Sequence, residues 1–290
     1  MATKKTPPRS ARRTSKKKTA SKRSSYLHGF TATETDRLQV QARTTEPWIH
    51  DRLPFRRARR MLEVGSGVGA QTEILLRHFP ELELTCVEKS SKQIEIARRF
   101  LRGVAHAHDR YEIHREDAMQ LSFGRECFDG AFLCWILEHV PDPAQVLAEV
   151  RRVLVPGSPI VVTEVMNHTF FLDPYSPNTW RYWMAFNDVQ REMGGDPFVG
   201  AKLGNLLQQN GYRDIQTEVK VVHFDNREPG ERADFIGFWS DLLLSGAEQL
   251  IAAKKVSKSM VERMQRELDR VAHDPNSIFF YAFLQARARA

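Results

Sequence analysis

One stretch, residues 61–72 (MLEVGSGVGAQT), constrains the fold of this 290-residue chain more than any other. Its first four residues are mostly apolar and predict a short buried strand, and glycines follow at Gly65, Gly67 and Gly69. Residues 71–79 then have the apolar spacing of a helix. A strand that passes through a glycine-rich turn into a helix is the first unit of a parallel α/β sheet. We expect a cofactor pocket at this turn, because glycine lets the backbone bend tightly and approach a ligand.

The same alternation of strand and helix continues along the chain. Further strands are predicted at residues 84–87, 111–114, 128–135, 158–165, 215–224 and 278–284. Helices are predicted at residues 92–101, after a cap at Ser90, and at residues 144–154 and 202–210. The unbroken apolar run 128–135 is typical of a central parallel strand. Residues 286–290 are expected to be frayed.

The positive charge is concentrated at the start of the chain. The formal net charge is +7, yet residues 1–25 hold ten Lys and Arg and no acid, which leaves 33 bases against 36 acids in the rest. A segment with so little to bury is predicted to be a disordered basic tail. It is either a solubilising tail with weak polyanion contacts, or a means of delivery to nucleic acid or a localisation signal.

The remaining composition sets the broad class. With 41% hydrophobic residues the chain has enough apolar material for one ordinary or two small domains. It contains no run of 18 apolar residues, and the tail lacks the apolar core of a secretion signal. Cys86, Cys127 and Cys134 have no metal-ligand spacing, so no metal site is expected, and three cysteines suit a reducing, cytoplasmic setting.

Two carboxylates follow neighbouring strands of the predicted sheet. Glu88 ends the second strand, 19 residues after Gly69, where an acid can accept hydrogen bonds from a ribose diol. The alternative is a solvated cap of the strand. Asp117 follows the third strand, where it can accept from an exocyclic amine, and Ala118 and Met119 offer an apolar wall for a flat ring.

Two segments are candidates for covering the pocket. A helix at residues 34–45, begun by Thr33 in an [ST]-x-x-[DE] pattern, either packs on the sheet edge or forms a lid with Tyr26, Arg37 and Gln41 reaching inward. Residues 167–199 are crowded with aromatic rings and start at the ligand-binding edge of the sheet. They are either a helical excursion over the core or a cap, and the cap predicts substrate contacts at Phe170, Tyr175, Trp180 and Trp183.

Two cofactor classes fit the glycine turn. Gly65, Gly67 and Ala70 satisfy the weak G-x-G-x-x-A pattern of dinucleotide-binding proteins. Glu63, however, would place a negative charge close to the pyrophosphate, and the last two strands suggest a hairpin-like edge instead of a second dinucleotide half. A nicotinamide-dinucleotide oxidoreductase is therefore the remoter alternative.

The segment LEVGSGVGAQT resembles the E/DxGxGxG motif of the class I S-adenosylmethionine-dependent methyltransferases. VEKS, EDAM and FDGAFLCWILEHVPDPAQVLAEVRRVLVPGSPIVVTE follow in the order of that family, and the last block resembles its ubiquinone-biosynthesis-like branch. The opening YLHGF is similar to small-molecule methyltransferases of that branch. The resemblance implies a Rossmann-like, seven-stranded, mostly parallel sheet in the order 3-2-1-4-5-7-6, with helices on both faces and helical cap insertions. It also implies S-adenosyl-L-methionine as the cofactor.

Carried over position by position, the resemblance implies a set of cofactor contacts. Glu63 and the glycine turn would hold the amino-acid end, Glu88 the ribose and Asp117 the adenine amine, while Cys134 and Trp135 would line the methionine portion. The whole implied set is Glu63, Gly65, Ser66, Gly67, Glu88, Lys89, Asp117, Ala118, Cys134, Trp135, Tyr26, Arg37 and Gln41.

The predicted reaction is methyl transfer by in-line displacement to a small, partly apolar or aromatic acceptor. A hydroxyl acceptor needs a base, and His139 is the closest candidate by position, although a histidine at a helix start is more often structural. The competing hypothesis is an RNA or protein methyltransferase recruited by the basic tail. The acceptor atom and the oligomeric state are left open.

We expect the chain to divide into a tail at residues 1–25 and a methyltransferase domain at residues 26–290. The parts expected within that domain are an N-terminal lid helix at 26–56, a cofactor-binding core at 57–166, an aromatic cap insertion at 167–199 and a helical insertion at 226–273.

Overall fold

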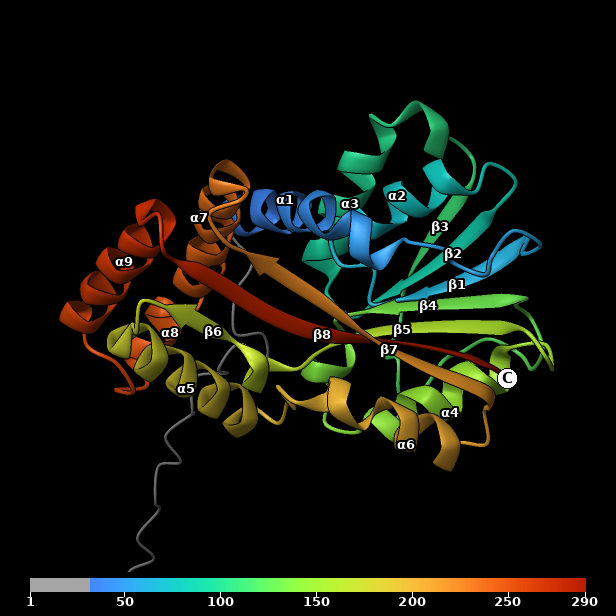
Figure 1. The fold of residues 1–290 in the computed structure, drawn as a ribbon. Coiled ribbons are helices and arrows are strands. Elements are labelled where there is room, and N and C mark those ends of the chain that lie inside the picture. The colour runs from blue at the N-terminus through green and yellow to red at the C-terminus, as the bar shows by residue number, and fades with distance from the viewer. Residues whose placement is uncertain (1–31) are drawn as a thin grey trace, which may run out of the picture.

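One sheet runs through the part of the chain that the computed structural model describes, residues 32–290 (Figure 1). The predictions for the basic tail, residues 1–25, and for Tyr26 lie outside these described residues. Within residues 32–290 the sheet has eight strands, and five of them form a continuous parallel block in the order β3-β2-β1-β4-β5. The bounds of the strands are β1 Arg60–Val64, β2 Glu83–Glu88, β3 Tyr111–Arg115, β4 Gly130–Cys134, β5 Pro159–Val165, β6 Phe171–Asp173, β7 Arg213–Phe224 and β8 Ile278–Arg289.

The last strand, β8, completes the sheet by antiparallel pairing. It pairs with β5 along one half, with the short β6 along the other half, and with β7 along its opposite edge. The predicted order 3-2-1-4-5-7-6 is therefore confirmed, with β8 as the predicted seventh strand and β7 as the sixth. The three-residue β6 was not predicted.

The central strands form where the sequence is apolar without interruption. In β4 (GAFLC) the first four residues are buried, and in β5 (PIVVTEV) five consecutive residues are buried. Strands that are covered by helices on both faces need apolar side chains in both directions, which produces this pattern.

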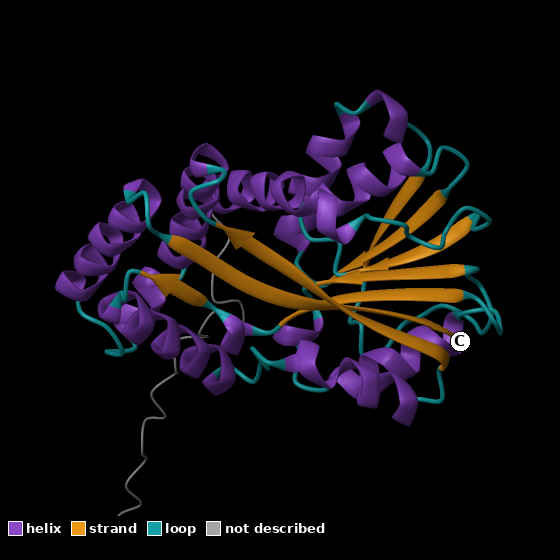
Figure 2. Ribbon diagram, viewed as in Figure 1, coloured by secondary structure: helices purple, strands orange, loops and turns teal. Residues whose placement is uncertain are grey.

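Helices cover both faces of the sheet (Figure 2). Side chains of α2 and α3 pack into the core on one face, and those of α4 and α6 pack into the core on the other. Ser90 caps α3 by accepting a hydrogen bond from the Gln93 N–H at 3.3 Å, as the sequence predicts. The bounds of the helices are α1 Ala32–Ile49, α2 Ala70–His78, α3 Ser91–Arg102, α4 Pro143–Val153, α5 Pro177–Glu192, α6 Leu203–Gln209, α7 Pro229–Ser245, α8 Ala247–Ala252 and α9 Lys258–His273.

The predicted insertions form a separate group of helices at one end of the sheet. Figure 1 shows α5, α7, α8 and α9 gathered beyond the carboxyl ends of the parallel strands, where β8 and β7 extend past them. Helix α9 packs against both α5 and α7, and α1 packs against α7. The insertions thus enclose the edge of the sheet where ligands bind in open α/β folds.

Three local predictions are wrong. The end of the chain is not frayed, because β8 runs to Arg289 between β5 and β7, and Ala290 exchanges backbone hydrogen bonds with Ser158 and Gly157 at 3.0 Å. Thr33 does not begin the N-terminal helix, since α1 already includes Ala32. That helix also runs to Ile49, four residues beyond the predicted end.

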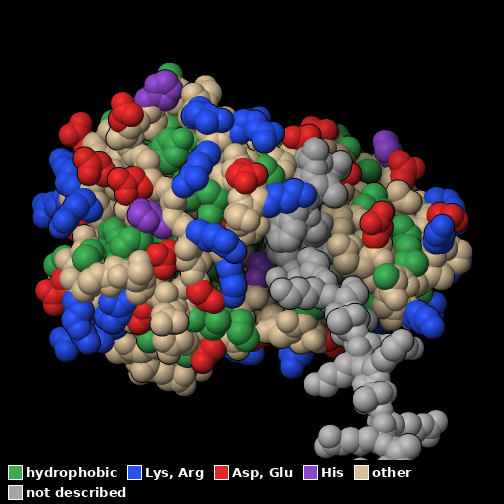
Figure 3. Space-filling view, turned by 180° about the vertical axis from the view of Figure 1, so that it is seen from behind, with side chains coloured by type: hydrophobic (Ala, Val, Ile, Leu, Met, Phe, Trp, Pro, Cys, Tyr) green, Lys and Arg blue, Asp and Glu red, His purple; other side chains and the backbone are tan. Residues whose placement is uncertain are grey.

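The surface of the described residues carries mixed charge. On the face drawn in Figure 3, outside the grey atoms, acidic and basic side chains are interspersed without a continuous patch of one sign. No helix within residues 32–290 is long and apolar enough to cross a membrane.

Candidate active site

The glycine turn after β1 approaches its neighbours closely. Gly65 has a φ of +75°, and its N–H donates to the Val87 carbonyl at 2.8 Å. A Cβ atom at Gly65 would lie 2.6 Å from Cδ1 of Ile136, which is well inside van der Waals contact. Both the backbone conformation and the lack of space therefore require glycine here.

Glu88 lies at the tip of β2, as the sequence predicts, and is tied to the glycine turn. Its Oε2 accepts from the Gly67 N–H at 3.1 Å and its Oε1 from the Ser90 N–H at 2.7 Å. Burial raises the pKa of the Glu88 carboxyl, while the hydrogen bonds from Ser90 and Gly67 act in the opposite direction. A carboxylate has about four lone-pair sites, so Glu88 can still accept from a ligand hydroxyl.

Glu63, for which the resemblance implies a cofactor contact, does not line the cavity described below. Its side chain is buried, accepts a hydrogen bond from Thr72 Oγ1 at 2.6 Å and contacts Cys86 Sγ at 3.4 Å. Burial raises the pKa of the Glu63 carboxyl to about 7, against the effect of these two hydrogen bonds. The reason is strand alternation: Glu63 and Met61 point to the same face of the sheet, beneath α2, and not toward the strand tip.

A cavity of about 630 Å³ opens along the carboxyl ends of β1, β2 and β4, within the usual size range of ligand pockets. At one end Asp117 and Lys89 form an ion pair of 2.7 Å, which holds the pKa of Asp117 below its usual range. Predicted residues that line the cavity are Arg37, Gln41, Gly65, Ser66, Gly67, Glu88, Lys89, Asp117, Ala118, Cys134, Trp135, His139 and Trp183.

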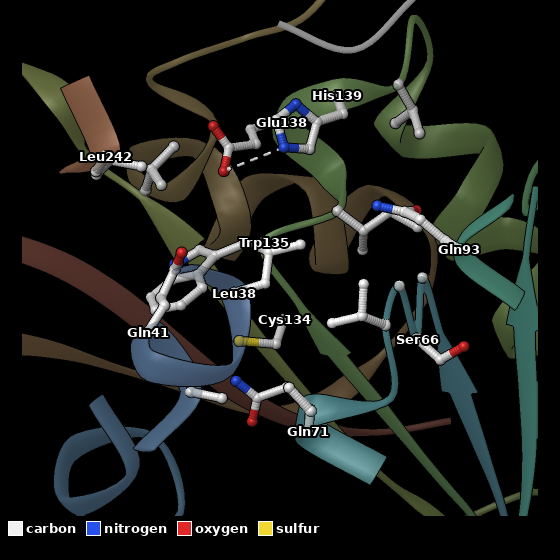
Figure 4. A pocket seen from close by; sticks show the side chains of 18 of the residues that line it. Leu38, Gln41, Ser66, Gln71, Gln93, Cys134, Trp135, Glu138, His139 and Leu242 are labelled. Carbon is white, nitrogen blue, oxygen red and sulfur yellow. Dashed lines mark ion pairs between the residues drawn. The ribbon is translucent and has the colours of Figure 1, made fainter. Parts of the chain in front are cut away.

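Trp135 is held in an unusual backbone conformation at the tip of β4. Its φ is +53°, and its N–H donates to the Thr163 carbonyl at 2.9 Å. Figure 4 places the Trp135 ring beside Gln41 and above Cys134 on the cavity wall. Such strain in a residue other than glycine is concentrated at functional sites, where the surrounding structure sustains it.

The N-terminal helix α1 covers the cavity, which favours the lid over simple edge packing. Arg37 is fixed there by two hydrogen bonds to the Glu34 carboxylate, at 2.7 and 2.8 Å, and by a third to Gln41 Oε1 at 2.6 Å. The far end of the helix is anchored on α2, where Glu46 pairs with Arg77 at 2.8 Å.

The opposite end of the cavity is an aromatic chamber. Trp183 and Phe186 of α5 enter it, and their rings stack with centroids 5.4 Å apart. Most of the remaining wall was not predicted as part of a site, although its α7 residues have the spacing of one helix face. These wall residues are Phe235, Phe238, Trp239 and Leu242 from α7, and Tyr281 and Phe283 from β8.

Three of the four predicted substrate contacts do not line the cavity. Phe170 is 1% exposed and stacks on Trp239 from behind, with ring centroids 5.2 Å apart. Trp180 packs beside Phe170, and Tyr175 is 71% exposed. Trp183 alone of the four reaches the chamber, because it lies on the α5 face that looks toward the sheet.

His139 lies on the wall between the two ends of the cavity. It ends a 3-10 turn, Leu137–His139, that begins two residues after β4. Its Nε2 is 3.7 Å from Oε1 of Glu138, which also lines the cavity (Figure 4). Glu88 is close enough for His139 to act on its pKa electrostatically. The imidazole therefore stands where the cofactor end meets the chamber.

Comparison with known proteins decides the family. Residues 62–162 match the family model described as a methyltransferase domain. The chain therefore contains a methyltransferase domain of the class I S-adenosylmethionine-dependent kind. The predicted fold class, enzyme class and cofactor are thereby confirmed.

The similar proteins include fungal O-methyltransferases. The chain is 34% identical over 158 residues to O-methyltransferase cnsE of Penicillium expansum, covering 53% of this chain and 52% of that protein. It is 29% identical over 185 residues to O-methyltransferase rstn1 of Aspergillus nomiae, covering 62% and 76%. The chain thus spans about half the length of the first of these relatives.

Solved structures support the fold. Phospholethanolamine N-methyltransferase 2 of Haemonchus contortus, in complex with S-adenosylhomocysteine, has a TM-score of 0.52 at 17% identity, covering 91% of this chain and 60% of that one. Neither the dinucleotide oxidoreductase nor the macromolecular methyltransferase finds support in these relatives.

Proposed function

We propose that this methyltransferase transfers a methyl group to a hydroxyl oxygen of a small, partly apolar or aromatic acceptor. The observation that carries the proposal is the single cavity that joins the glycine turn to an aromatic chamber. An aromatic chamber of this kind favours a flat apolar molecule over a polar macromolecular segment. Oxygen is preferred as the acceptor atom because both fungal relatives carry the name O-methyltransferase.

The donor set at the other end fits S-adenosylmethionine. Glu88 offers free lone pairs for ribose hydroxyls, and Asp117 offers carboxylate oxygens for an exocyclic amine. The backbone of Gly65, Ser66 and Gly67, with Arg37 and Gln41, would hold the amino-acid end. When bound, the cofactor supplies an electrophilic methyl group on a sulfonium.

The residues of this chain would act through positioning and proton transfer. The chamber rings orient the acceptor and exclude water, and such positioning supplies a large part of the rate enhancement in displacement reactions. His139 would take the hydroxyl proton, because it stands between the chamber and the cofactor end. A base placed in this way contributes about 10²- to 10⁴-fold to the rate.

Two measurements test the proposal. Calorimetric titration should show binding of S-adenosylmethionine and no binding of NADH. A methyl-transfer assay with labelled S-adenosylmethionine and a panel of naphthols and hydroxyquinolines should give labelled ethers, and His139→Asn should lower kcat about 100-fold or more without weakening cofactor binding. Binding of NADH would contradict the cofactor assignment. Full activity of His139→Asn would contradict the role of His139 as the base.

We also propose a cytoplasmic setting and the division of the chain given above. The three cysteines are all free thiols in the structure, which suits a reducing compartment. The division is supported by the positions of α1, of the parallel strands and of the helices α5 and α7–α9, which lie within the proposed ranges. Polyanion contacts through residues 1–25 remain a proposal based on charge alone.

A further inference from the structure

Glu138 is a buried carboxylate in the wall of the chamber. Its side chain is 11% exposed, and its Oε2 accepts from Nε2 of Gln190 on α5 at 2.6 Å. The other oxygen, Oε1, faces Nε2 of His139 at 3.7 Å. Figure 4 shows the two side chains turned toward each other. Gln190 lies on the same face of α5 as Trp183 and Phe186, so the helix that builds the chamber also holds this carboxylate.

The turn that carries both residues is fixed from several directions. Oε1 of Glu164, on β5, accepts from the N–H groups of Ile136 and Leu137 at 2.9 and 2.6 Å. The carbonyl of Glu138 accepts from the N–H of Asp196 at 2.9 Å. The carboxylate and the imidazole are therefore held by packing and hydrogen bonds, as a preorganised catalytic pair requires.

Glu138 lies beside a second buried carboxyl group, that of Glu164. Burial and the neighbouring Glu138 hold the pKa of Glu164 well above its usual range. Among the described residues no Lys or Arg lies within ion-pairing distance of Glu138. A buried carboxylate without a cation is costly, and the imidazole is the cationic partner within reach.

We propose that Glu138, held by Gln190, is a positioning residue that orients the His139 imidazole and stabilises its protonated form. This inference rests on the proposed function. As the acceptor oxygen gains the methyl group and the carbon–sulfur bond breaks, the hydroxyl proton passes to the imidazole. A protonated imidazole carries N–H at both nitrogens, so Nε2–H then faces Oε1 of Glu138.

Other titratable groups surround this pair. They come from four strands of the sheet and form the surroundings in which a change at Glu138 is measured: Glu88 at the tip of β2, Cys134 on β4, Glu164 on β5 and Tyr281 on β8.

The test is a histidine titration by NMR on the full chain without ligand, with His139 assigned from the signal lost in His139→Asn. In Glu138→Gln the midpoint of His139 should move to lower pH by about one unit, because the nearby negative charge is gone. Gln190→Leu, which removes only the amide, should move it in the same direction by less. The matched control is Glu46→Gln, since Glu46 pairs with His78 at 2.8 Å outside the cavity. It should shift His78 and the nearby His50 and leave His139 unchanged.

An unchanged His139 midpoint in both Glu138→Gln and Gln190→Leu would overturn the inference. An equal shift of His139 in Glu46→Gln would also overturn it, by showing that the response is not local. Because the titration needs neither cofactor nor acceptor, its result is independent of the proposed function. Failure of S-adenosylmethionine to bind, or full activity of His139→Asn, would remove the proposed function while leaving the electrostatic pair in place.

Discussion

Replacing Glu88 by glutamine should weaken cofactor binding without unfolding the protein. The carboxylate already accepts one backbone N–H on each oxygen, at 3.1 and 2.7 Å. An amide would retain one acceptor oxygen but turn its NH₂ group toward the other backbone donor, and it would lose the charge that strengthens a hydrogen bond from a ribose hydroxyl. A hydrogen bond to a charged group is worth about 1.5–3 kcal/mol, which corresponds to an increase in Kd of about 10- to 150-fold.

The assay is calorimetric titration with S-adenosylhomocysteine near pH 7.5, alongside a thermal unfolding scan. Glu63→Gln is the matched control, because Glu63 is a buried acid on the neighbouring strand that does not line the cavity. That variant should bind the ligand within about twofold of the wild type, a difference below about 0.5 kcal/mol. Unchanged affinity in Glu88→Gln, or equal loss in both variants, would refute the assignment of the ribose site.

Three further predictions follow from the same structure. Leu242→Trp should fill part of the chamber and raise the KM for a naphthol acceptor at least about tenfold. Its control, Phe170→Leu, changes a residue behind the chamber wall and should lower Tm while leaving that KM within about twofold. The pKa of Glu63 is about 7 in the folded protein and 4.5 in the unfolded chain, so the folded state loses a stabilising proton as the pH rises. In urea titrations the free energy of unfolding should therefore fall between pH 5 and 8, by up to about 3 kcal/mol relative to Glu63→Gln. Deletion of residues 1–25 should leave turnover of a small acceptor unchanged, whereas a salt-dependent loss of RNA binding and activity would instead support a macromolecular substrate.

The parallel core could be predicted from the sequence because its signals are local. Apolar runs mark β4 and β5, and the turn at Gly65 needs glycine for reasons of backbone geometry and space. The residues that end a strand fall at the same edge of a parallel sheet, so Glu88 and Asp117 could be assigned to one site without knowledge of their contacts.

The chamber could not be predicted in the same way, because its wall depends on contacts between distant segments. Aromatic residues at 167–199 look alike in the sequence, yet Phe170 packs behind Trp239 while Trp183 faces the cavity. Which ring is inside depends on how α7 docks against α5 and β8. Glu63 shows a related limit: its motif suggested a ligand contact, but strand alternation turns it beneath α2, where it bonds Thr72.

The end of the chain illustrates the opposite error. Residues 286–290 alternate Ala and Arg and contain no strong strand formers, so they suggest fraying. In the structure, small Ala286 and Ala288 are buried between the sheet and α4 and α6, while Arg287 donates to the Asp51 carbonyl at 3.0 Å. Pairing on both edges overrides the weak local preference.

The most direct test of the account is a crystal structure of the full chain with S-adenosylhomocysteine. We predict the ribose hydroxyls within about 3 Å of the Glu88 carboxylate, the adenine amine near Asp117, and the sulfur facing the chamber beside Trp135 and His139. A nucleoside bound elsewhere, with Glu88 and Asp117 far from it, would contradict the central claim.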